Sequence, residues 1–506
     1  MNKQMDTYSA ILVNDGFIKA TGSRDELKAK YNFSKEIDLQ GYTILPAFTD
    51  SHLHLLNFGL GLDNIILDNC TLDESLAKVH ETTKMVPSNE WIIGRGFNFN
   101  DWEEGWPQMS WLDKVAPNHP VVLIAKDGHL VWGNRIAFEL ANITKETLAP
   151  EGGAITKDAN GELVGTLTEK AITLLLNKIP SPSEVARKRA LEKAISVAYS
   201  FGITAVHTME DRQTWLALQE LRESKGLKFR VLLSIPVEEL DSAINLGIRT
   251  GFGDQILRIG SVKIFADGSL GSRTAWMLKP YTGTNNFGIR VTNENRLKEM
   301  IAKANNAGLS VAVHAIGDGA NRAVLDAIET VGNRKLRNRI EHAQLVSPVD
   351  IPRFAQLNIV ASMQPTQCPE DRYMSDEHWG ERCAFAYPFR SLLDSGATLA
   401  FGSDAPVESC DTLLGLYSAV ARKRWNEAGS ESWYFNQAIS IEEAVKGYTI
   451  GAAIAANEEH YRGKLETGYQ ADFTILSHDI FNNEPEILKE TKIVATYFQG
   501  KKVFSK

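Results

Sequence analysis

The sequence has few cysteines, no long hydrophobic run and no excess of basic residues. Its 506 residues include only Cys70, Cys368, Cys383 and Cys410, which are widely spaced and form no CxxC pair. We therefore expect reduced thiols in a cytoplasmic protein rather than a disulfide framework. No apolar stretch reaches the roughly 18–20 residues of a membrane span, and the N-terminal residues lack the apolar core of a signal peptide.

The charge balance argues against polyanionic partners. Acidic residues exceed basic ones, which gives a net charge of -9 at pH 7. Nucleic acids and anionic membrane surfaces attract basic proteins, so neither is an expected partner. The expected partner is a small-molecule substrate. Hydrophobic residues make up 43% of the chain and charged residues 23%, which is typical of a soluble globular protein. The length suggests more than one domain.

Both ends of the chain read as β-structure. Short alternating apolar runs at residues 11–13, 471–476 and 493–498 are bounded by turn signals, and Gln499-Gly500 has the character of a hairpin turn. We therefore predict one composite β-sandwich domain that combines residues 1–48 with residues 455–506.

The middle of the chain alternates short apolar runs with helical patterns, and many of the runs lead to a polar residue. The eight runs are residues 43–45 leading to His52, 203–206 to His207, 229–235, 259–265 around Lys263, 309–313 to His314, 339–340 to His342, 359–363, and 398–401 to Asp404. This pattern favours an α/β fold with a distorted (β/α)8 TIM barrel, whose catalytic groups lie at the C-terminal strand ends. A doubly wound open sheet is the alternative, and so many polar strand ends argue against it.

About 140 residues separate the first barrel strand from the second, far more than the ~2–6 residues of an ordinary βα loop. We therefore predict a barrel from residues 49–60 and 200–454, and a domain of residues 61–199 inserted over the pocket. Five of the insert's tryptophans are Trp91, Trp102, Trp106, Trp111 and Trp132. They would either line a pocket for apolar substrates or build the insert's own core.

The pair His52 and His54 is the strongest local motif. Residues i and i+2 of a strand share one face and lie about 7 Å apart, so both imidazoles can reach one cation. Alone, such a pair is more often a surface or core feature. His314 and His342 at the ends of two further strands strengthen the metal interpretation, because zinc binds imidazole readily. Asp404 would be either a turn residue before a proline or a carboxylate that contacts the metal and accepts a proton from its water.

Lys263 lies in the middle of an apolar strand, where a charged side chain is costly unless paired. It is either a salt-bridged structural lysine or a lysine carboxylated by CO2. The spacing leaves both interpretations open.

Taken together, these residues resemble the amidohydrolase superfamily, and most closely its YtcJ-like branch (amidohydrolase family 3), which includes N-substituted formamide deformylases. The resemblance covers essentially the whole chain. It rests on residues 45–52, 125–129, 262–275, 314–321 and 463–473. Ala47 departs from the pattern, because glycine usually follows the proline there.

The resemblance implies a metal site formed by His52, His54, Lys263, His314, His342 and Asp404. It implies one or two Zn2+ ions, with Lys263 carboxylated if two bind. Asp404, His314 and His342 would act in catalysis, with Asp404 as the base. His129, Asp267, Arg273 and Gln364 would contact substrate; a buried structural role is the alternative for His129. His207 has no ligand role in this pattern.

The expected activity is that of a zinc-dependent amidohydrolase that attacks an amide-type, non-peptide C–N bond with metal-activated water. A deaminase or a lactonase of the same superfamily is the alternative enzyme. A non-catalytic, metal-bound regulatory barrel is the alternative from another class, although it would be expected to lose the base. Because many superfamily members are dimers, a homodimer is also considered.

Overall fold

The computed structural model describes residues 6–150, 152–427, 429 and 431–506, which form two compact units. One unit combines the chain up to Phe58 with Leu191–Lys506, and the other is Gly59–Ala190. Both crossings between the units lie inside helices, α2 (Leu55–Gly61) and α7 (Glu184–Ser200).

The first unit contains an eight-stranded parallel sheet that curls into a barrel, which confirms the predicted fold class. In spatial order the strands are β4 (Phe48–Leu53), β11 (Ile203–Thr208), β12 (Arg230–Pro236), β13 (Leu257–Phe265), β14 (Val311–Ala315), β15 (Arg339–His342), β16 (Val360–Met363) and β17 (Thr398–Phe401). Just beyond the ends of β17 and β4, the Asp404 N–H donates to the His52 carbonyl at 2.7 Å, and the His54 N–H donates to the Ala405 carbonyl at 2.8 Å. These two bonds join the last strand to the first.

Burial explains the long apolar runs of the barrel strands. Every residue of β4 and β11 is buried, as expected for parallel strands that are covered on both faces. The covering helices are amphipathic; in α10 the buried side chains include Leu297, Ile301 and Ala304, which recur at helical spacing.

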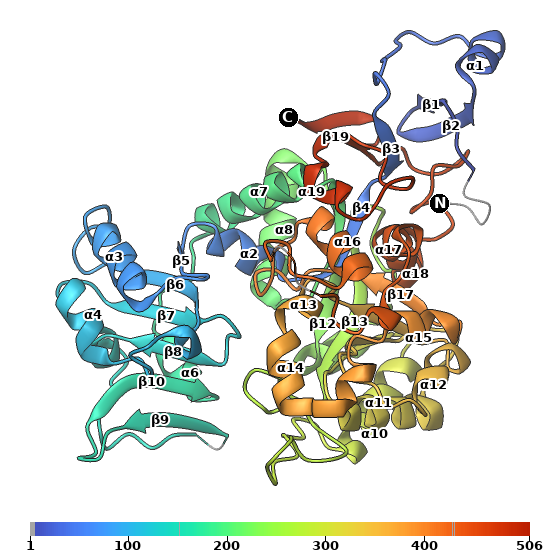
Figure 1. Ribbon diagram of the computed structural model, residues 1–506. Coiled ribbons are helices and arrows are strands. Elements are labelled where there is room, and N and C mark those ends of the chain that lie inside the picture. Colours follow the sequence, from blue (N-terminus) through green and yellow to red (C-terminus); the bar gives the residue numbers. More distant parts are fainter. Residues whose placement is uncertain (1–5, 151, 428, 430) are drawn as a thin grey trace. The chain divides into compact units, whose positions relative to one another are not determined.

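The helices of this unit are short, and most of them follow a barrel strand. They are α1 (Arg24–Lys30), α8 (Arg212–Lys225), α9 (Leu240–Asn245), α10 (Glu294–Asn306), α11 (Asp318–Val331), α12 (Ile351–Gln356), α13 (Gln367–Glu370), α14 (Arg372–Trp379), α15 (Phe389–Asp394), α16 (Thr412–Ala421), α17 (Ile441–Lys446), α18 (Ala452–Ala455) and α19 (Ile487–Glu490). Helices α10, α11 and α12 lie together beside the barrel strands (Figure 1).

Strands from both ends of the chain form a second, antiparallel sheet. Its order is β20 (Lys501–Ser505), β19 (Ile493–Phe498), β18 (Phe473–Leu476) and β3 (Thr43–Pro46), so the blue β3 and the red β19 belong to one sheet (Figure 1). A separate hairpin pairs β1 (Ala10–Asn14) with β2 (Phe17–Gly22). The predicted turn between β19 and β20 is present, with φ of 49° at Gln499 and 71° at Gly500, a backbone suited to a two-residue hairpin.

The predicted first barrel run, residues 43–45, was wrong. These residues belong to β3, where Ile44 pairs with Ile475 of β18, and the first barrel strand is β4 instead. Pro46 explains the break, because a residue without an N–H cannot continue the hydrogen-bond ladder of a central strand.

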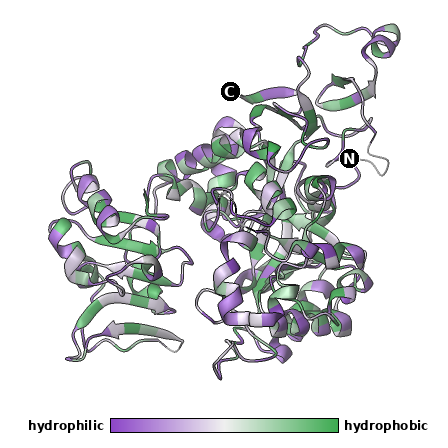
Figure 2. Cartoon of the chain, in the orientation of Figure 1, coloured by the Kyte–Doolittle hydropathy of each residue, from purple (hydrophilic) through white to green (hydrophobic). Residues whose placement is uncertain are grey.

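The second unit has its own six-stranded sheet, in the order β5 (Ile65–Ile66), β6 (Ile92–Phe97), β7 (Val121–Ala125), β8 (Leu130–Gly133), β10 (Leu163–Glu169) and β9 (Gly153–Lys157). Helices α3 (Leu72–Thr83), α4 (Met109–Val115), α5 (Arg135–Leu140) and α6 (Ile172–Leu176) accompany it. Helix α3 begins at Thr71, whose hydroxyl accepts from the Glu74 N–H while the Glu74 carboxylate accepts from the Thr71 N–H, a capping box. Hydrophobic residues (green) concentrate on the strands of this sheet (Figure 2).

The tryptophans of this unit form much of its core. Trp102 and Trp132 are buried, and the ring of Phe97 lies 5.5 Å from that of Trp102 and 5.9 Å from that of Trp132. Trp111 packs against the same cluster. Trp106 is 38% exposed. Core packing therefore accounts for most of the tryptophan content of the insert.

Among the residues that the structure describes, no helix has both the length and the apolar character needed to cross a membrane.

Candidate metal centre

His52 and His54 lie at the C-terminal end of β4, where the barrel closes. His52 is within the strand and buried, whereas His54 follows the strand and its side chain is 26% exposed. The His52 Nε2 lies 3.4 Å from the Asp404 Oδ1, and the His54 Nε2 lies 3.3 Å from the same oxygen. Asp404 thus meets both histidines of the motif from the end of β17.

His342 completes a tight group at the end of β15. Ligand atoms of His52, His342 and Asp404 all lie within 4.8 Å of one another. His342 has a φ of 71° and Asp404 a φ of 62°. This left-handed backbone is uncommon outside glycine, and such conformations concentrate at functional sites.

The protonation states of these groups suit a cation. The His52 Nδ1 lies 2.6 Å from the Glu341 Oε2. Burial alone would raise the pKa of Glu341, but Arg339 and His52 hold it well below its usual value, so the carboxylate is ionised and the His52 Nδ1 carries the proton. The His52 Nε2 then presents a lone pair to the Asp404 carboxylate at 3.4 Å. Two acceptors that face each other without a proton repel, and a bound cation between them removes this cost.

Burial also keeps the His342 imidazole neutral, which is the form that binds metals. It lowers the pKa of His342 well below the usual value. The His342 Nδ1 is buried and has no hydrogen-bond partner among the described residues. Imidazole nitrogens with a carboxylate oxygen are a donor set that zinc prefers, so the residues present fit a divalent metal.

His314 lies beside this group but faces another way. Its ring is 4.5 Å from the ring of His342, and its Nε2 donates to the Gly268 carbonyl at 3.0 Å. Its nitrogens are outside the set of ligand atoms that lie within 4.8 Å of one another. The predicted ligand role of His314 stays a prediction. Burial, followed by the charge of Lys263, lowers its pKa to about 3.

Lys263 is buried in β13, and burial lowers its pKa to about 8. Its Nζ lies 4.9 Å from the centre of the Phe265 ring. Within the described ranges it forms no ion pair within 4.0 Å. The salt-bridged alternative therefore finds no support in the arrangement.

Glu341 and Arg339 are functional candidates that the sequence reasoning missed. Arg339 is fully buried and donates to both oxygens of Glu341, to the Ser362 Oγ at 2.8 Å and to the carbonyl of Ser51 beside His52. A carboxylate that orients a metal-binding imidazole is a frequent feature of metal sites. The available signal was the pair of opposite charges at i and i+2 in a strand otherwise expected to be apolar.

Two further polar residues hold Asp404 and its strand. The buried Asp50 accepts from the Ser403 N–H at 3.0 Å and from the Ser403 Oγ at 2.6 Å, which ties the end of β17 to β4. Burial raises the pKa of Asp50 to about 7. Gln367 donates from its Nε2 to the Asp404 Oδ2 at 3.3 Å. The Asp404 Oδ1 therefore faces the histidines while its Oδ2 is held from the opposite side.

The predicted substrate-binding residues have different surroundings. Asp267 is buried and accepts backbone N–H groups of Trp276, Ile316 and Gly317, with burial raising its pKa to about 7. These bonds fix the loops after β13 and β14. Arg273 is exposed, and Gln364 is buried with an unpartnered Oε1. Their contact with a substrate stays a prediction.

His129 and His207 each have a polar partner of their own. His129 belongs to the second unit, where its Nδ1 lies 3.1 Å from the Glu169 Oε2. His207 is buried in β11, and its Nδ1 lies 2.9 Å from the Arg339 Nη1.

Comparison with known proteins places this arrangement in a family. The sequence model of the amidohydrolase family matches residues 35–504. The chain belongs to the amidohydrolase family. The resemblance drawn from the motifs is thereby confirmed, and so is the coarser expectation of a hydrolase.

Relatives align with this amidohydrolase over nearly its full length. The Bacillus subtilis (strain 168) protein YtcJ is 36% identical, and the alignment covers 100% of this chain and 98% of that protein. The N-substituted formamide deformylase of Arthrobacter pascens is 28% identical over 97% of this chain and 94% of its own. Among solved structures, an uncharacterized metal-dependent hydrolase from Pyrococcus horikoshii OT3 is similar with a TM-score of 0.78 and 28% identity, covering 94% of each chain.

Proposed function

We propose that this amidohydrolase is a zinc enzyme that cleaves an amide-type, non-peptide C–N bond of a small molecule. The observation that carries the proposal is the convergence of His52, His54 and His342 on Asp404. His52, His54, His342 and Asp404 would hold the metal. A bound divalent metal supplies Lewis acidity and lowers the pKa of a water molecule to about 7.

Asp404 moves the proton in this proposal. Burial would raise the pKa of Asp404, but the hydrogen bond from His54 helps to hold it below its usual value, so its carboxylate is ionised. It takes the proton of the attacking water and then gives it to the leaving nitrogen. Gln367, through its bond to the Asp404 Oδ2, keeps the carboxylate in the orientation for both transfers.

His314 is proposed to stabilise the oxyanion of the substrate. Its Nε2 carries a proton, since this atom donates to the Gly268 carbonyl. Because the ring is neutral and buried, it would supply a hydrogen bond in a region of low dielectric, where such bonds are strongest.

We further propose that Lys263 is carboxylated when two metals bind. With a pKa of about 8, roughly a tenth of the amine is neutral at pH 7. The neutral Nζ attacks the carbon of CO2, a C–N bond forms, and one proton leaves to solvent. The resulting carbamate is an anionic oxygen ligand that replaces the buried ammonium group of Lys263.

The printed name of one relative supports the choice of substrate class. The Arthrobacter pascens relative acts on N-substituted formamides, and an apolar N-substituted amide is the proposed substrate class here. Lactones and aminated heterocycles are the classes that distinguish the alternatives, lactonase and deaminase.

The test combines metal content with turnover. Purified protein is analysed for metals, stripped with a chelator, reloaded with Zn2+ and assayed with N-substituted formamides, lactones and aminopurines. Loss of amide hydrolysis on stripping and its recovery with Zn2+ are expected, and Asp404→Asn should lower turnover at least 100-fold. Asp350→Asn is the matched control, because Asp350 is a buried, salt-bridged carboxylate whose partners are Arg322 and Arg353. Full activity in the stripped protein, or hydrolysis of lactones alone, would overturn the proposal.

A further inference from the structure

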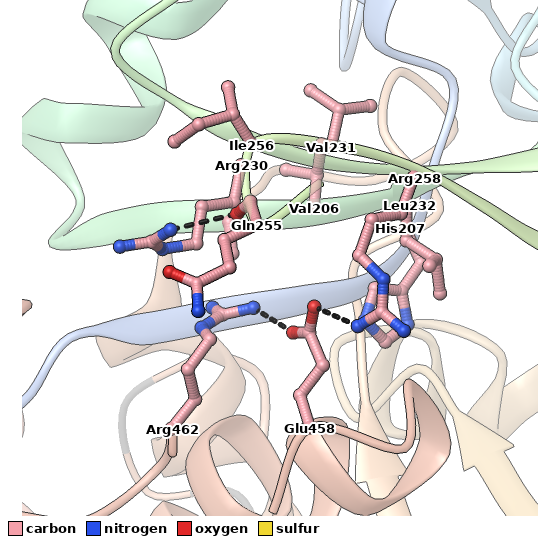
Figure 3. Close-up of a pocket in the computed structure, with 11 residues that line it drawn as sticks. Val206, His207, Arg230, Val231, Leu232, Gln255, Ile256, Arg258, Glu458 and Arg462 are labelled. Atoms are coloured by element: carbon pink, nitrogen blue, oxygen red, sulfur yellow. Dashed lines mark hydrogen bonds and ion pairs between the residues drawn. The ribbon is translucent and has the colours of Figure 1, made fainter. Parts of the chain in front are cut away.

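A small cavity lies near the N-terminal ends of β12 and β13, whereas the metal centre is at the C-terminal strand ends. Its volume is about 10 Å³, close to the space needed by a single water-sized species. Glu458 and Arg462, from the segment after α18, close it from one side (Figure 3). Its lining comprises Ala205, Val206, His207, Arg230, Val231, Leu232, Gln255, Ile256, Arg258, Glu458 and Arg462.

His207 contributes an unsatisfied donor to this lining. Its Nδ1 lies 2.9 Å from the Arg339 Nη1. Because arginine only donates, the Nδ1 must be the acceptor, and the ring proton is on the Nε2. That Nε2 is buried, with 2% of the residue exposed, and has no partner among the described residues. A buried N–H without an acceptor is costly, so an acceptor is expected in the cavity.

The lining carries more positive than negative charge. Arg258 Nη1 donates to the Glu458 Oε1 at 2.7 Å, and Arg462 pairs with the other oxygen of Glu458. Both arginines hold the pKa of Glu458 at about 2 against the effect of burial, so Glu458 is ionised.

Arg230, the third lining cation, pairs with Asp472 at 2.7 Å. Three guanidinium groups therefore face two carboxylates, and one positive charge remains uncompensated. Both Glu458 oxygens are already occupied as acceptors. The lining thus offers donors and positive charge to whatever occupies the cavity, and burial of an unbalanced charge is unfavourable without a counterion.

We propose that this cavity binds one small monovalent anion of the halide class, which accepts the His207 Nε2–H and balances the excess positive charge of Arg258 and Arg462, which share Glu458. The site is independent of the proposed amide hydrolysis. Gln255 is exposed and the Arg258 side chain is 14% exposed, so a halide would enter on this side of the lining.

Crystals of the full chain grown in bromide test the site directly. An anomalous peak within hydrogen-bond distance of the His207 Nε2 is expected at millimolar bromide. In solution, chloride should raise the Tm of the protein by about 2 °C in a saturable manner over gluconate at equal ionic strength. A cavity that holds only water-weight density, or chloride and gluconate melting curves that coincide, would overturn the proposal. So would a peak that appears only at molar bromide.

Two variants of His207 form a matched pair. His207→Asn keeps an acceptor near the position of the Nδ1 for Arg339 but removes the donor at the Nε2 position. His207→Gln keeps a donor that reaches the Nε2 position. The chloride-dependent rise in Tm should disappear in His207→Asn and persist in His207→Gln. Equal chloride responses in both variants would show that the ion, if present, does not depend on His207, and would overturn the assignment.

Discussion

Replacing Glu341 with glutamine should weaken metal binding without removing a metal ligand. In the native protein the Glu341 Oε2 accepts from the His52 Nδ1 at 2.6 Å, and both side chains are at most 1% exposed. The amide of Glu341→Gln is uncharged, and either its oxygen or its nitrogen can face His52. In the native protein the Glu341 charge fixes the proton on the His52 Nδ1, which leaves the Nε2 lone pair directed at the metal position. The variant lacks this charge.

The magnitude follows from two separate losses. Loss of a carboxylate that orients a ligating histidine typically costs about 10- to 100-fold in metal affinity, which corresponds to about 1.4–2.7 kcal/mol. Independently, the fully buried Arg339 loses its ion-pair partner. Removal of one member of a buried pair costs about 3–5 kcal/mol of folding stability, so the metal-free variant should also melt at a lower temperature.

The assay must separate these two effects. Metal-stripped protein is titrated with Zn2+ against a chromophoric chelator at pH 7.5, and melting curves are recorded for the same samples. Asp350→Asn serves as the control, since it breaks partly buried ion pairs with Arg322 and Arg353 and should lower the Tm while leaving the Zn2+ affinity unchanged. If Glu341→Gln bound Zn2+ within threefold of the native protein, the inferred role of Glu341 would be refuted.

Three further predictions concern other parts of the protein. A Cβ added at Gly402 would lie 2.4 Å from the His52 N and 2.7 Å from the Asp50 Oδ1, so Gly402→Ala should cost roughly 1–3 kcal/mol of stability and lower the Zn2+ affinity; unchanged melting and titration curves would contradict this. The pKa of His314 is about 3, below its unfolded value, so the unfolded chain binds a proton that the native state does not as the pH falls below about 6.5. In urea unfolding of the metal-free proteins between pH 6 and 4, the free energy of unfolding of the native sequence should therefore fall by about 1.4 kcal/mol per pH unit more than that of His314→Asn. Parallel pH profiles of the two proteins would argue against a buried neutral His314. Trp132→Ala should cost about 3–5 kcal/mol in the second unit with unchanged Zn2+ content, measured by proteolysis and metal analysis; loss of metal would contradict the core role of this tryptophan.

The barrel could be predicted because most of its strands are buried apolar runs, and several of these runs lead to a polar side chain. The runs leading to His207, His314, His342 and Asp404 all correspond to barrel strands. The run before His52 was the exception. Strands β3 and β4 are separated by a single residue, Ala47. An apolar pattern does not reveal that the chain changes sheets after Pro46.

The predicted metal ligands were recognised as histidines and carboxylates, whereas the residues that orient them were not. Glu341, Asp50 and Gln367 act through partners that are distant in the sequence; Glu341 meets His52 across 289 positions and Asp50 meets Ser403 across 353. A single sequence carries no record of such pairs. In the sequence alone, a carboxylate next to a histidine, such as Glu341, therefore cannot be told from an ordinary polar residue. Its role becomes visible when the fold brings it to its partner.

The position of the metal centre has a consequence for folding. His52 and Asp404 belong to the first and the last barrel strands, and the backbone bonds that join these strands run between His52, His54, Asp404 and Ala405 themselves. A metal held by His52 and Asp404 would therefore also hold the barrel closed. Binding to the closed form alone stabilises it by mass action. Because opening of the barrel at this seam would break these bonds first, Zn2+ should protect the amides of His54 and Asp404 from hydrogen exchange more than the amides of β14, on the opposite side of the barrel.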